Sequence, residues 1–334
     1  MNDKKLRVAL IGCGVISDNH ILPLLSLPEC ELVAICDVQL SRAIAKRDEH
    51  AKGAEVFSDY REMLRVIKPD AVHIATPHYL HAEMSIAALE SGAHVFLEKP
   101  MATTREDARR MIDAARESGR LLSICFQNRF SPTVEALGRL LKQYPPTAAY
   151  ASVVWGRDES YYNADPWRGR LATEGGGVLI NQAVHTLDLL CFFLGKPKFV
   201  SATTANHHLK DVIEVEDSAE GMIEFESGVR ASFYATTAFG GREQTELFFC
   251  SGEHEIRLIG DALTLDGVLV PVASQCTPDG KECYGTGHQF LIRRFYDAIA
   301  RGEESPVTPE SAYLPLTLLL GAYASHGECV ALDT

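Results

Sequence analysis

The first third of the chain alternates short runs of aliphatic and β-branched residues with longer segments whose apolar residues recur every three or four positions. The short runs predict strands, and the longer segments predict amphipathic helices. We expect strands at 7–11, 31–36, 71–75, 94–97 and 121–125. We expect helices between them, including 59–67, 81–91 and 104–118. Strand and helix in alternation predict a parallel sheet that is covered on both faces.

From about residue 148 the pattern changes to runs with a rough two-residue alternation, which is typical of strands with one buried face. These runs lie at 148–155, 198–204, 219–225, 229–236 and 246–250, and turn residues separate some of them. Two helical stretches, 289–300 and 309–327, follow. We therefore predict an α/β domain over residues 1–125, followed by an α+β domain over 126–334 with a large, mainly antiparallel open sheet.

Composition narrows the functional classes. A chain of 334 residues suggests two domains. The net charge of −13 argues against binding to nucleic acid or to a membrane surface, since both need a basic face. The nine cysteines include no Cys-x-x-Cys pair, which favours reduced thiols in the cytoplasm over a disulfide framework or a zinc site. We expect no signal peptide and no membrane span, because polar residues interrupt the apolar stretch 178–194.

The first predicted strand runs into the sequence Gly-Cys-Gly-Val-Ile-Ser at 12–17, and a helical pattern follows it. This is the context of a dinucleotide-binding fingerprint, so we predict a Rossmann domain. Gly12 would allow the tight turn and Gly14 would let a pyrophosphate approach the backbone. The N–H groups of Val15 and Ile16 would face that anion at the helix N-terminus.

Asp37 ends the second predicted strand, about twenty residues beyond the glycines. A carboxylate there can accept hydrogen bonds from the adenosine ribose hydroxyls and would repel a 2′-phosphate. We therefore expect NAD, with NADP less favoured. The alternative is that Asp37 is simply the N-cap of the next helix.

Two further segments carry a family resemblance. The sequence Ala-Thr-Pro-His-Tyr-Leu-His at 75–81 and the sequence Gly-Ala-His-Val-Phe-Leu-Glu-Lys-Pro at 92–100 resemble the Gfo/Idh/MocA family of sugar-type dehydrogenases. The resemblance implies that Lys99 contacts both the cofactor and the reacting substrate oxygen, where its ammonium would stabilise a developing alkoxide. It also implies that Glu98 positions Lys99 and the cofactor, that Thr76 and Pro77 line the nucleotide, and that Asn128 lies near the nicotinamide.

A second signature follows a glycine run at 175–177. Asn181, His185 and Asp188 are spaced by four and three residues, so a regular helix would place them on one face. The resemblance implies that His185 is the general acid/base, whereas a structural histidine is the alternative. Several family members have Asp where this chain has Asn181. The Asn-Gln-x-x-His form resembles a branch that includes nucleotide-sugar 3-dehydrogenases.

Other polar residues are weaker candidates. Trp167 could pack on a sugar face and Arg168 could hold a carboxylate or phosphate, although Trp167 could equally anchor its loop in the core. His288 is a further candidate. The spacing of His78 and His81 could suggest a metal, but no third ligand is apparent nearby and we predict no metal site.

We conclude from the sequence that the protein is an NAD-dependent oxidoreductase. It would transfer a hydride between nicotinamide and a carbinol or carbonyl of a sugar, cyclic polyol or nucleotide-sugar. Two alternatives remain open: glycoside hydrolysis through transient oxidation by NAD, and a non-catalytic NAD-binding regulator. The resemblance also implies a homodimer or homotetramer, formed through the exposed face of the C-terminal sheet.

Overall fold

The computed structural model describes residues 5–239, 241, 243–272 and 287–334. The described residues divide into two compact units: 5–127 with 287–310, and 128–272 with 311–334. The division after residue 127 lies two positions from the predicted boundary. Residues 287–310 group with the first unit, whereas the sequence analysis assigned them to the second domain.

In the described part of the first unit, six parallel strands form one sheet in the order β3-β2-β1-β4-β5-β6. This is the strand order of a doubly wound dinucleotide-binding fold. Their side chains are mostly buried, as expected for a parallel sheet covered on both faces. The strands are β1 Leu6–Ile11, β2 Cys30–Cys36, β3 Glu55–Phe57, β4 Ala71–Ile74, β5 His94–Leu97 and β6 Leu122–Ile124.

Helices connect these strands and begin where capping residues predict. Asp59 accepts from the N–H groups of Arg61 and Glu62 at the start of α3, and Thr104 accepts from Asp107 N–H at the start of α5. Helix α10 packs against α1, which is why it groups with this unit. The helices are η1 Val15–Ser17, α1 Asp18–Leu25, α2 Leu40–His50, α3 Tyr60–Ile67, η2 His78–Leu80, α4 His81–Glu90, α5 Arg105–Ser118 and α10 Gly287–Arg301.

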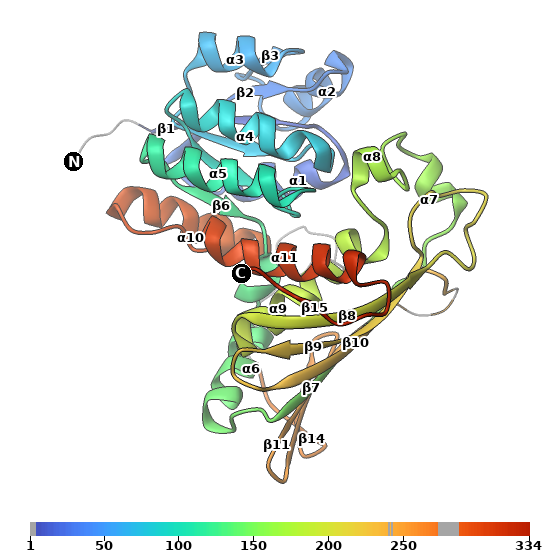
Figure 1. The fold of residues 1–334 in the computed structure, drawn as a ribbon. Helices are drawn as coiled ribbons and strands as arrows, with labels where there is room; N and C mark the ends of the chain where they lie inside the picture. The colour runs from blue at the N-terminus through green and yellow to red at the C-terminus, as the bar shows by residue number, and fades with distance from the viewer. Residues whose placement is uncertain (1–4, 240, 242, 273–286) are drawn as a thin grey trace. The chain divides into compact units, whose positions relative to one another are not determined.

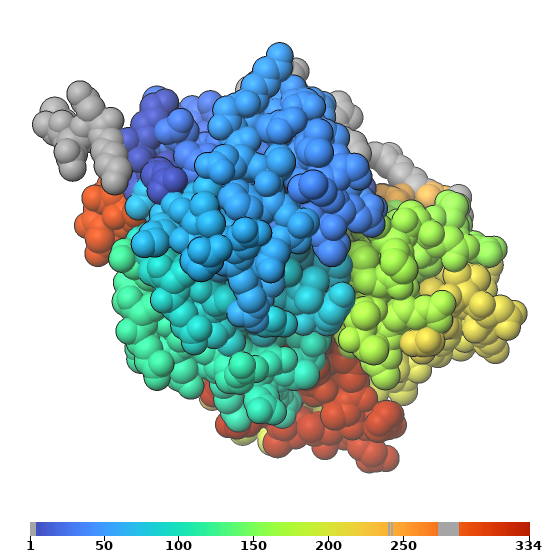
Figure 2. Space-filling view, turned by 90° about the horizontal axis from the view of Figure 1, so that it is seen from above, coloured from blue at the N-terminus to red at the C-terminus, as the bar shows by residue number. Residues whose placement is uncertain are grey.

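The layering of this unit is visible in Figure 1, where helices α4 and α5 run beside each other along the sheet. In the space-filling view the blue-to-green residues of the unit form one continuous mass (Figure 2). The carboxyl ends of β1, β2, β4 and β5 all lie at one edge of the parallel sheet, so the loops that follow them share that edge. These loops carry most of the predicted cofactor residues.

In the described part of the second unit, nine strands form a sheet in the order β14-β13-β12-β11-β7-β10-β9-β8-β15. All neighbours are antiparallel except β7 and β10, so the prediction of a mainly antiparallel open sheet is confirmed. The strands are β7 Ala148–Val154, β8 Pro197–Ala205, β9 Ser218–Phe225, β10 Arg230–Thr236, β11 Gln244–Ser251, β12 His254–Ile259, β13 Ala262–Leu265, β14 Val268–Leu269 and β15 Val330–Ala331.

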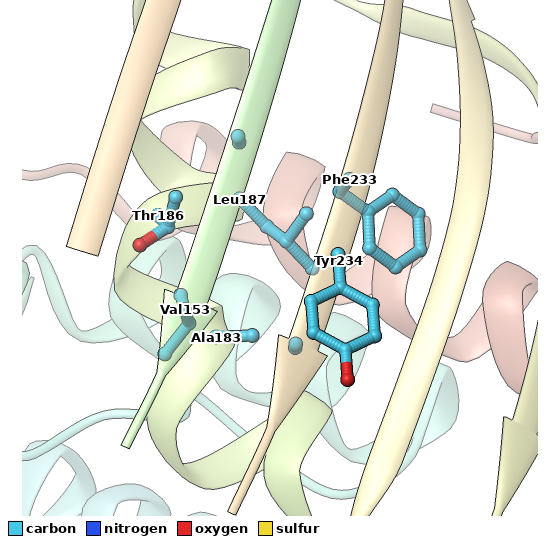
Figure 3. Close-up of a pocket in the computed structure, with 8 residues that line it drawn as sticks. Val153, Ala183, Thr186, Leu187, Phe233 and Tyr234 are labelled. Carbon is cyan, nitrogen blue, oxygen red and sulfur yellow. The ribbon is translucent and has the colours of Figure 1, made fainter. Parts of the chain in front are cut away.

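One face of this sheet is covered by an apolar helical segment, which consists of η4 and α9 at residues 179–194. Ala183 and Leu187 of that segment lie against Val153 and Phe233 on neighbouring strands (Figure 3). The remaining helices are η3 Gln127–Phe130, α6 Pro132–Gln143, α7 Glu159–Asn163, α8 Leu171–Glu174, the π-helix η4 Leu179–Ala183, α9 Val184–Leu194 and α11 Pro309–Ser325.

This segment lies within the one stretch of the described chain that has the length and composition to cross a membrane. That stretch spans Leu171–Leu194, with a mean hydropathy of 1.5 in its most apolar window. Of that window, 78% is buried inside the structure. A helix that is apolar on all sides is also what a core position requires, and the packing against the sheet accounts for its composition.

Candidate active site

The glycine loop after β1 has two glycines with different roles. Gly12 has φ of +97°, and a Cβ there would lie 2.3 Å from the carbonyl oxygen of Ala75. The fold itself therefore requires glycine at this position. A Cβ on Gly14 would meet nothing within 4 Å, so this glycine leaves open space beside the backbone. Ser17 is fully buried and donates to the Gly14 carbonyl oxygen at 2.7 Å, which closes the loop.

Asp37, at the end of β2, joins two loops. Its carboxylate accepts from Cys13 N–H at 2.9 Å and from Gln39 N–H at 2.8 Å. The N-cap position of α2 is Gln39, so Asp37 lies before the helix and is not its N-cap residue. It holds the glycine loop against the β2 turn and places a carboxylate where the ribose of a dinucleotide is predicted to lie.

Three further features of these loops fit a bound dinucleotide. Val15 and Val38 are large apolar residues that are 65% and 86% exposed. The Thr76 hydroxyl, in the loop after β4, is buried and has no hydrogen-bond partner among the described residues. Such a group is costly unless a partner is supplied. Together with the open space at Gly14, these features leave room and an unsatisfied hydroxyl in the loops where NAD is predicted to bind.

His81 ties the loop after β4 to the loop after β5. It is fully buried, with Nδ1 2.7 Å from the carbonyl oxygen of Pro100 and Nε2 2.9 Å from that of Thr76. Burial lowers the pKa of His81 in spite of these two carbonyl contacts. His81 also begins helix α4, so one of the two histidines considered as a metal pair has a structural role.

Glu98 and Lys99 follow β5 directly, at the edge of the sheet that carries the glycine loop. Glu98 is only 6% exposed, and its Oε1 lies 3.0 Å from His20 Nε2 and 3.4 Å from His288 Nε2. Burial alone would raise the pKa of Glu98, but the hydrogen bonds from both histidines outweigh it and hold this pKa well below its usual range. From the sequence, His288 was only a weak candidate, and no motif marked His20.

The one group of three potential metal ligands found among the described residues is Glu98, Cys125 and His288, with ligand atoms within 4.8 Å of one another. Burial and the neighbouring Glu98 carboxylate raise the pKa of the Cys125 thiol well above its ordinary value. The hydrogen bonds within the group explain its arrangement as a polar network of the protein.

In the second unit, the glycine run at 175–177 is required by close packing. A Cβ on Gly176 would lie 2.0 Å from the Tyr323 hydroxyl, and one on Gly177 would lie 1.8 Å from the carbonyl oxygen of Glu216. The Glu216 carboxylate accepts from the N–H groups of Gly177 and Leu179 and from Tyr323 Oη. Burial raises the pKa of Glu216 although these three donors oppose it. No sequence motif marked this carboxylate.

Two residues of the predicted polar stripe, Asn181 and Asp188, have different hydrogen-bond partners. Asp188 is fully buried and makes a two-point ion pair with Arg129, at 2.9 and 2.5 Å. The Asp188 carboxylate is therefore engaged in an ion pair inside the second unit, and the shared helical face of the three residues stays a prediction. Asn181 lies in the π-helix Leu179–Ala183, whose wider turn changes its angular spacing relative to His185 and Asp188, which both lie in the regular helix α9. His185 lies in the first turn of α9.

Asn181 contacts a carboxylate that the sequence did not reveal. Its side-chain amide donates to Glu174 Oε1 at 2.5 Å and to Tyr161 Oη at 3.4 Å. Glu174 is 1% exposed and also accepts from Gly169 N–H. Glu174 lies seven residues before Asn181 and across the glycine turn, so helical spacing could not predict this contact.

Arg168 lies between two aromatic rings. Its guanidinium carbon is 4.4 Å from the ring centre of Tyr161 and 4.7 Å from that of Trp167, and its Nη1 donates to Tyr161 Oη. Asp165 lies 3.5 Å from Arg168 Nε. The predicted residues Trp167 and Arg168 thus form one cluster with Tyr161. The Tyr161 hydroxyl also accepts from the Asn181 amide, so Asn181 is connected to this cluster.

The predicted residues fall into two groups. Gly12, Gly14, Val15, Ile16, Asp37, Thr76, Pro77, Glu98 and Lys99 belong to the first unit. Trp167, Arg168, Asn181 and His185 belong to the second. Asn128, predicted near the nicotinamide, lies in η3 and is the first residue of the second unit.

Comparison with known proteins identifies both parts of the chain. Residues 6–126 match the family model of the GFO/IDH/MocA oxidoreductases, described as a family with an NAD-binding Rossmann fold. Residues 145–265 match the model of the GFO/IDH/MocA C-terminal domain.

Individual relatives are similar over most of their length. A D-glucoside 3-dehydrogenase of Escherichia coli K12 is 33% identical over 279 residues, which cover 75% of this chain and 76% of that protein. The WlbA dehydrogenase of Bordetella pertussis, solved with NADH and UDP-GlcNAcA, is 29% identical with a TM-score of 0.87 and covers 99% of this chain and all of that one. The Chromobacterium WlbA dehydrogenase, solved with the same ligands, is 30% identical with a TM-score of 0.86, covering 100% of this chain and 97% of that one.

Proposed function

This chain belongs to the Gfo/Idh/MocA family of NAD-dependent oxidoreductases, and we propose that it interconverts a hydroxyl and a carbonyl at C3 of a sugar ring. The E. coli relative is named for oxidation at that carbon, and the WlbA enzymes were solved with a nucleotide-linked sugar acid. The substrate class proposed for this chain is accordingly a glucoside or a nucleotide-linked pyranose.

The observation that carries the proposal is the turn Glu98-Lys99-Pro100 at the carboxyl end of β5. In a sheet of this order, ligands bind at the carboxyl edge, where the glycine loop and Asp37 also lie. Lys99 stands between two residues with fixed contacts: Glu98 with His20 and His288, and Pro100 with His81. This support favours a precise position for the Lys99 ammonium.

The chemistry assigned to each residue follows from its charge. We assign Lys99 to the reacting substrate oxygen, where the ammonium stabilises negative charge as the carbinol loses its proton. His185 accepts that proton in oxidation and returns it in reduction. Bound NAD supplies the hydride acceptor. Trp167 and Arg168 are assigned to the remainder of the sugar, through ring contact and hydrogen bonding.

The test is a substrate screen with the purified protein and NAD. The panel contains methyl glucosides, UDP-GlcNAcA and myo-inositol, and NADH formation is followed by absorbance. A matched 3-O-methyl glucoside has no free C3 hydroxyl and should give no NADH. Equal reduction of NAD by the blocked and unblocked glucosides would contradict oxidation at C3. Release of the aglycone without net NADH would support the alternative of glycoside hydrolysis through transient oxidation.

The role of Lys99 is tested separately. We expect Lys99→Ala to lower turnover by about a hundredfold or more, because it removes the charge that stabilises the alkoxide, while NADH affinity changes little. Lys99→Arg is the control, since it keeps the charge but changes its geometry. Wild-type turnover in Lys99→Ala would refute this role.

We also propose a cytoplasmic homodimer or homotetramer. All seven cysteines in the described part of the chain are free thiols, which supports a reducing compartment. Met222 on β9 and Tyr234 on β10 are 51% and 39% exposed, on the face of the large sheet opposite to the apolar helical segment. Apolar side chains on an open sheet face favour association of two copies.

A further inference from the structure

The first unit contains a string of buried polar side chains whose role the family motif does not explain. His20 comes from α1, His73 from β4, Glu98 from the end of β5, and His288 and Tyr296 from α10. All five are at most 6% exposed. Buried polar groups are expensive unless each has a partner, and here the partners are mainly one another.

The contacts form a continuous chain. Tyr296 Oη lies 3.0 Å from His73 Nε2, and His73 Nδ1 lies 2.9 Å from His20 Nδ1. His20 Nε2 lies 3.0 Å from Glu98 Oε1, and His288 Nε2 reaches the same oxygen at 3.4 Å. The Cys125 thiol also forms a hydrogen bond with Glu98. Four elements besides the β5 turn therefore contribute to the surroundings of one carboxylate.

The donors and acceptors of this chain can be assigned. Between His73 Nδ1 and His20 Nδ1, one nitrogen must carry the hydrogen and the other must accept it. If His73 donates, Tyr296 Oη donates to His73 Nε2 and a neutral His20 donates through Nε2 to Glu98. If His20 donates, it is either an imidazolium that also donates through Nε2 to Glu98, or a neutral ring that accepts at Nε2 from a protonated Glu98. The lowered pKa of Glu98 favours the assignments in which its carboxylate is ionised and accepts the His20 N–H.

We propose that His20 and His288 are positioning residues that hold Glu98 as a carboxylate and thereby fix the place and the charge environment of Lys99. This inference rests on the proposed role of Lys99. It assigns a function to two residues outside the Glu-Lys-Pro turn, and it explains why a histidine on α1 and another on α10 converge on one carboxylate oxygen.

Burial would favour the neutral acid, and the two N–H donors reverse that preference. Loss of one donor should therefore raise the pKa of Glu98 toward neutrality. The titratable groups around Glu98 are His20 and His73, His288 on α10, Cys125 after β6, and Lys99 in the same turn. Of these, His73 is kept neutral, because burial lowers its pKa well below the ordinary value.

The first experiment needs no substrate and measures the melting temperature against pH for wild type, His20→Leu and His20→Gln. Leucine removes the donor, whereas a glutamine amide can donate to Glu98 and accept from His73. A carboxyl whose folded pKa is raised binds a proton in the folded state before the unfolded chain does, so stability rises as the pH falls. The deficit of His20→Leu should therefore shrink between about pH 7.5 and about pH 5.5. His20→Gln should show little of this effect.

Tyr296→Phe is the matched control. It removes a hydrogen bond from the same buried chain without touching Glu98, so its deficit in melting temperature should be nearly independent of pH. His288→Leu is the second variant, which decides the matter if His20→Leu does not fold, and it should behave as His20→Leu does. A pH-independent deficit in both leucine variants would overturn the proposal.

The second experiment measures kcat, KM and their pH dependence with the substrate found in the screen. His20→Leu should lower kcat by about tenfold, leave NADH affinity within about threefold, and move the acidic limb of the kcat profile to higher pH by about one unit. His20→Gln should recover most of the wild-type kcat and most of the wild-type pH profile. If Lys99→Ala is inactive but the kcat profile of His20→Leu equals that of the wild type, only the inference about His20 is refuted. If Lys99→Ala keeps full activity, the proposed function itself is refuted.

Discussion

At the scale of single residues, Asn181 shows how one substitution changes the chemistry of its neighbours. Several family members carry a carboxylate here, but in this chain the Asn181 amide donates to Glu174 at 2.5 Å. The carboxylate is thus present in the cluster, supplied from the other side of the glycine turn. An amide at 181 is the side chain that this buried acceptor can use, since a second carboxylate would offer no donor.

Asn181→Asp should consequently be destabilising. A buried carboxylate and a half-buried one beside it cannot both ionise without cost, so one pKa rises above its unfolded value. We expect a loss of about 1–3 kcal/mol in the free energy of unfolding near pH 8. The loss should shrink as the pH falls, because the folded protein takes up the proton first. Denaturant unfolding at two pH values measures this.

The double variant Asn181→Asp with Glu174→Gln is the control, because it restores an amide–carboxylate pair in the reverse order. It should recover most of the stability. A single variant as stable as wild type at high pH would show that the two side chains are not held together.

Asp37 is the residue on which cofactor preference depends. Asp37→Asn keeps the shape of the side chain but removes the charge that disfavours a 2′-phosphate. We expect NADH to bind more weakly and the ratio of NADPH to NADH affinity to rise by about tenfold, equivalent to about 1.4 kcal/mol. Titration of cofactor fluorescence measures both constants. Since Asp37 also holds Cys13 N–H, the melting temperature must be measured beside them. An unchanged ratio would exclude Asp37 from the ribose site.

At the scale of elements, the glycine loop separates a structural glycine from a ligand-binding one. Gly12→Ala forces a Cβ against the Ala75 carbonyl at a positive φ, and we expect a loss of about 2 kcal/mol or more in stability. Gly14→Ala meets no atom within 4 Å and has an allowed backbone, with φ of −74°. It should melt close to wild type while NADH binding weakens by about tenfold or more, because the methyl group occupies the space assigned to the pyrophosphate. Normal NADH binding by Gly14→Ala would place the phosphates elsewhere.

The elements that local patterning specifies were predictable, and those that depend on distant contacts were not. The strand at 94–97 follows from its run of apolar residues, and the helix after Thr104 follows from apolar periodicity and a capping side chain. Helix α2 was missed because Ala43 is its one buried residue, so its pattern is weak. The π-helix at Leu179–Ala183 was missed because the predicted spacing from Asn181 onward assumed a regular α-helical turn. His20 had no motif to mark it, since its partner Glu98 is distant in sequence.

At the scale of the whole molecule, a strongly acidic chain leaves an apolar area on its large sheet. The net charge of −13 disfavours association in general, so apolar side chains that remain exposed on a regular surface are significant. Met222 and Tyr234 lie on adjacent strands, and their face is opposite to the one that Phe233 turns toward the apolar helical segment. Glu220 and Glu224 flank Met222 on the same face.

Met222→Glu should therefore dissociate the proposed oligomer. The substitution adds a third carboxylate to this face, and two copies meeting there would bring like charges together without a compensating partner. Sedimentation velocity should show the oligomer for wild type and the monomer for the variant, with a difference that narrows at high salt as the repulsion is screened. Val268→Glu, at a 70% exposed apolar residue on the edge strand β14, is the matched control and should remain oligomeric. If Met222→Glu keeps the wild-type mass while Val268→Glu dissociates, the interface lies at the sheet edge and not on its face.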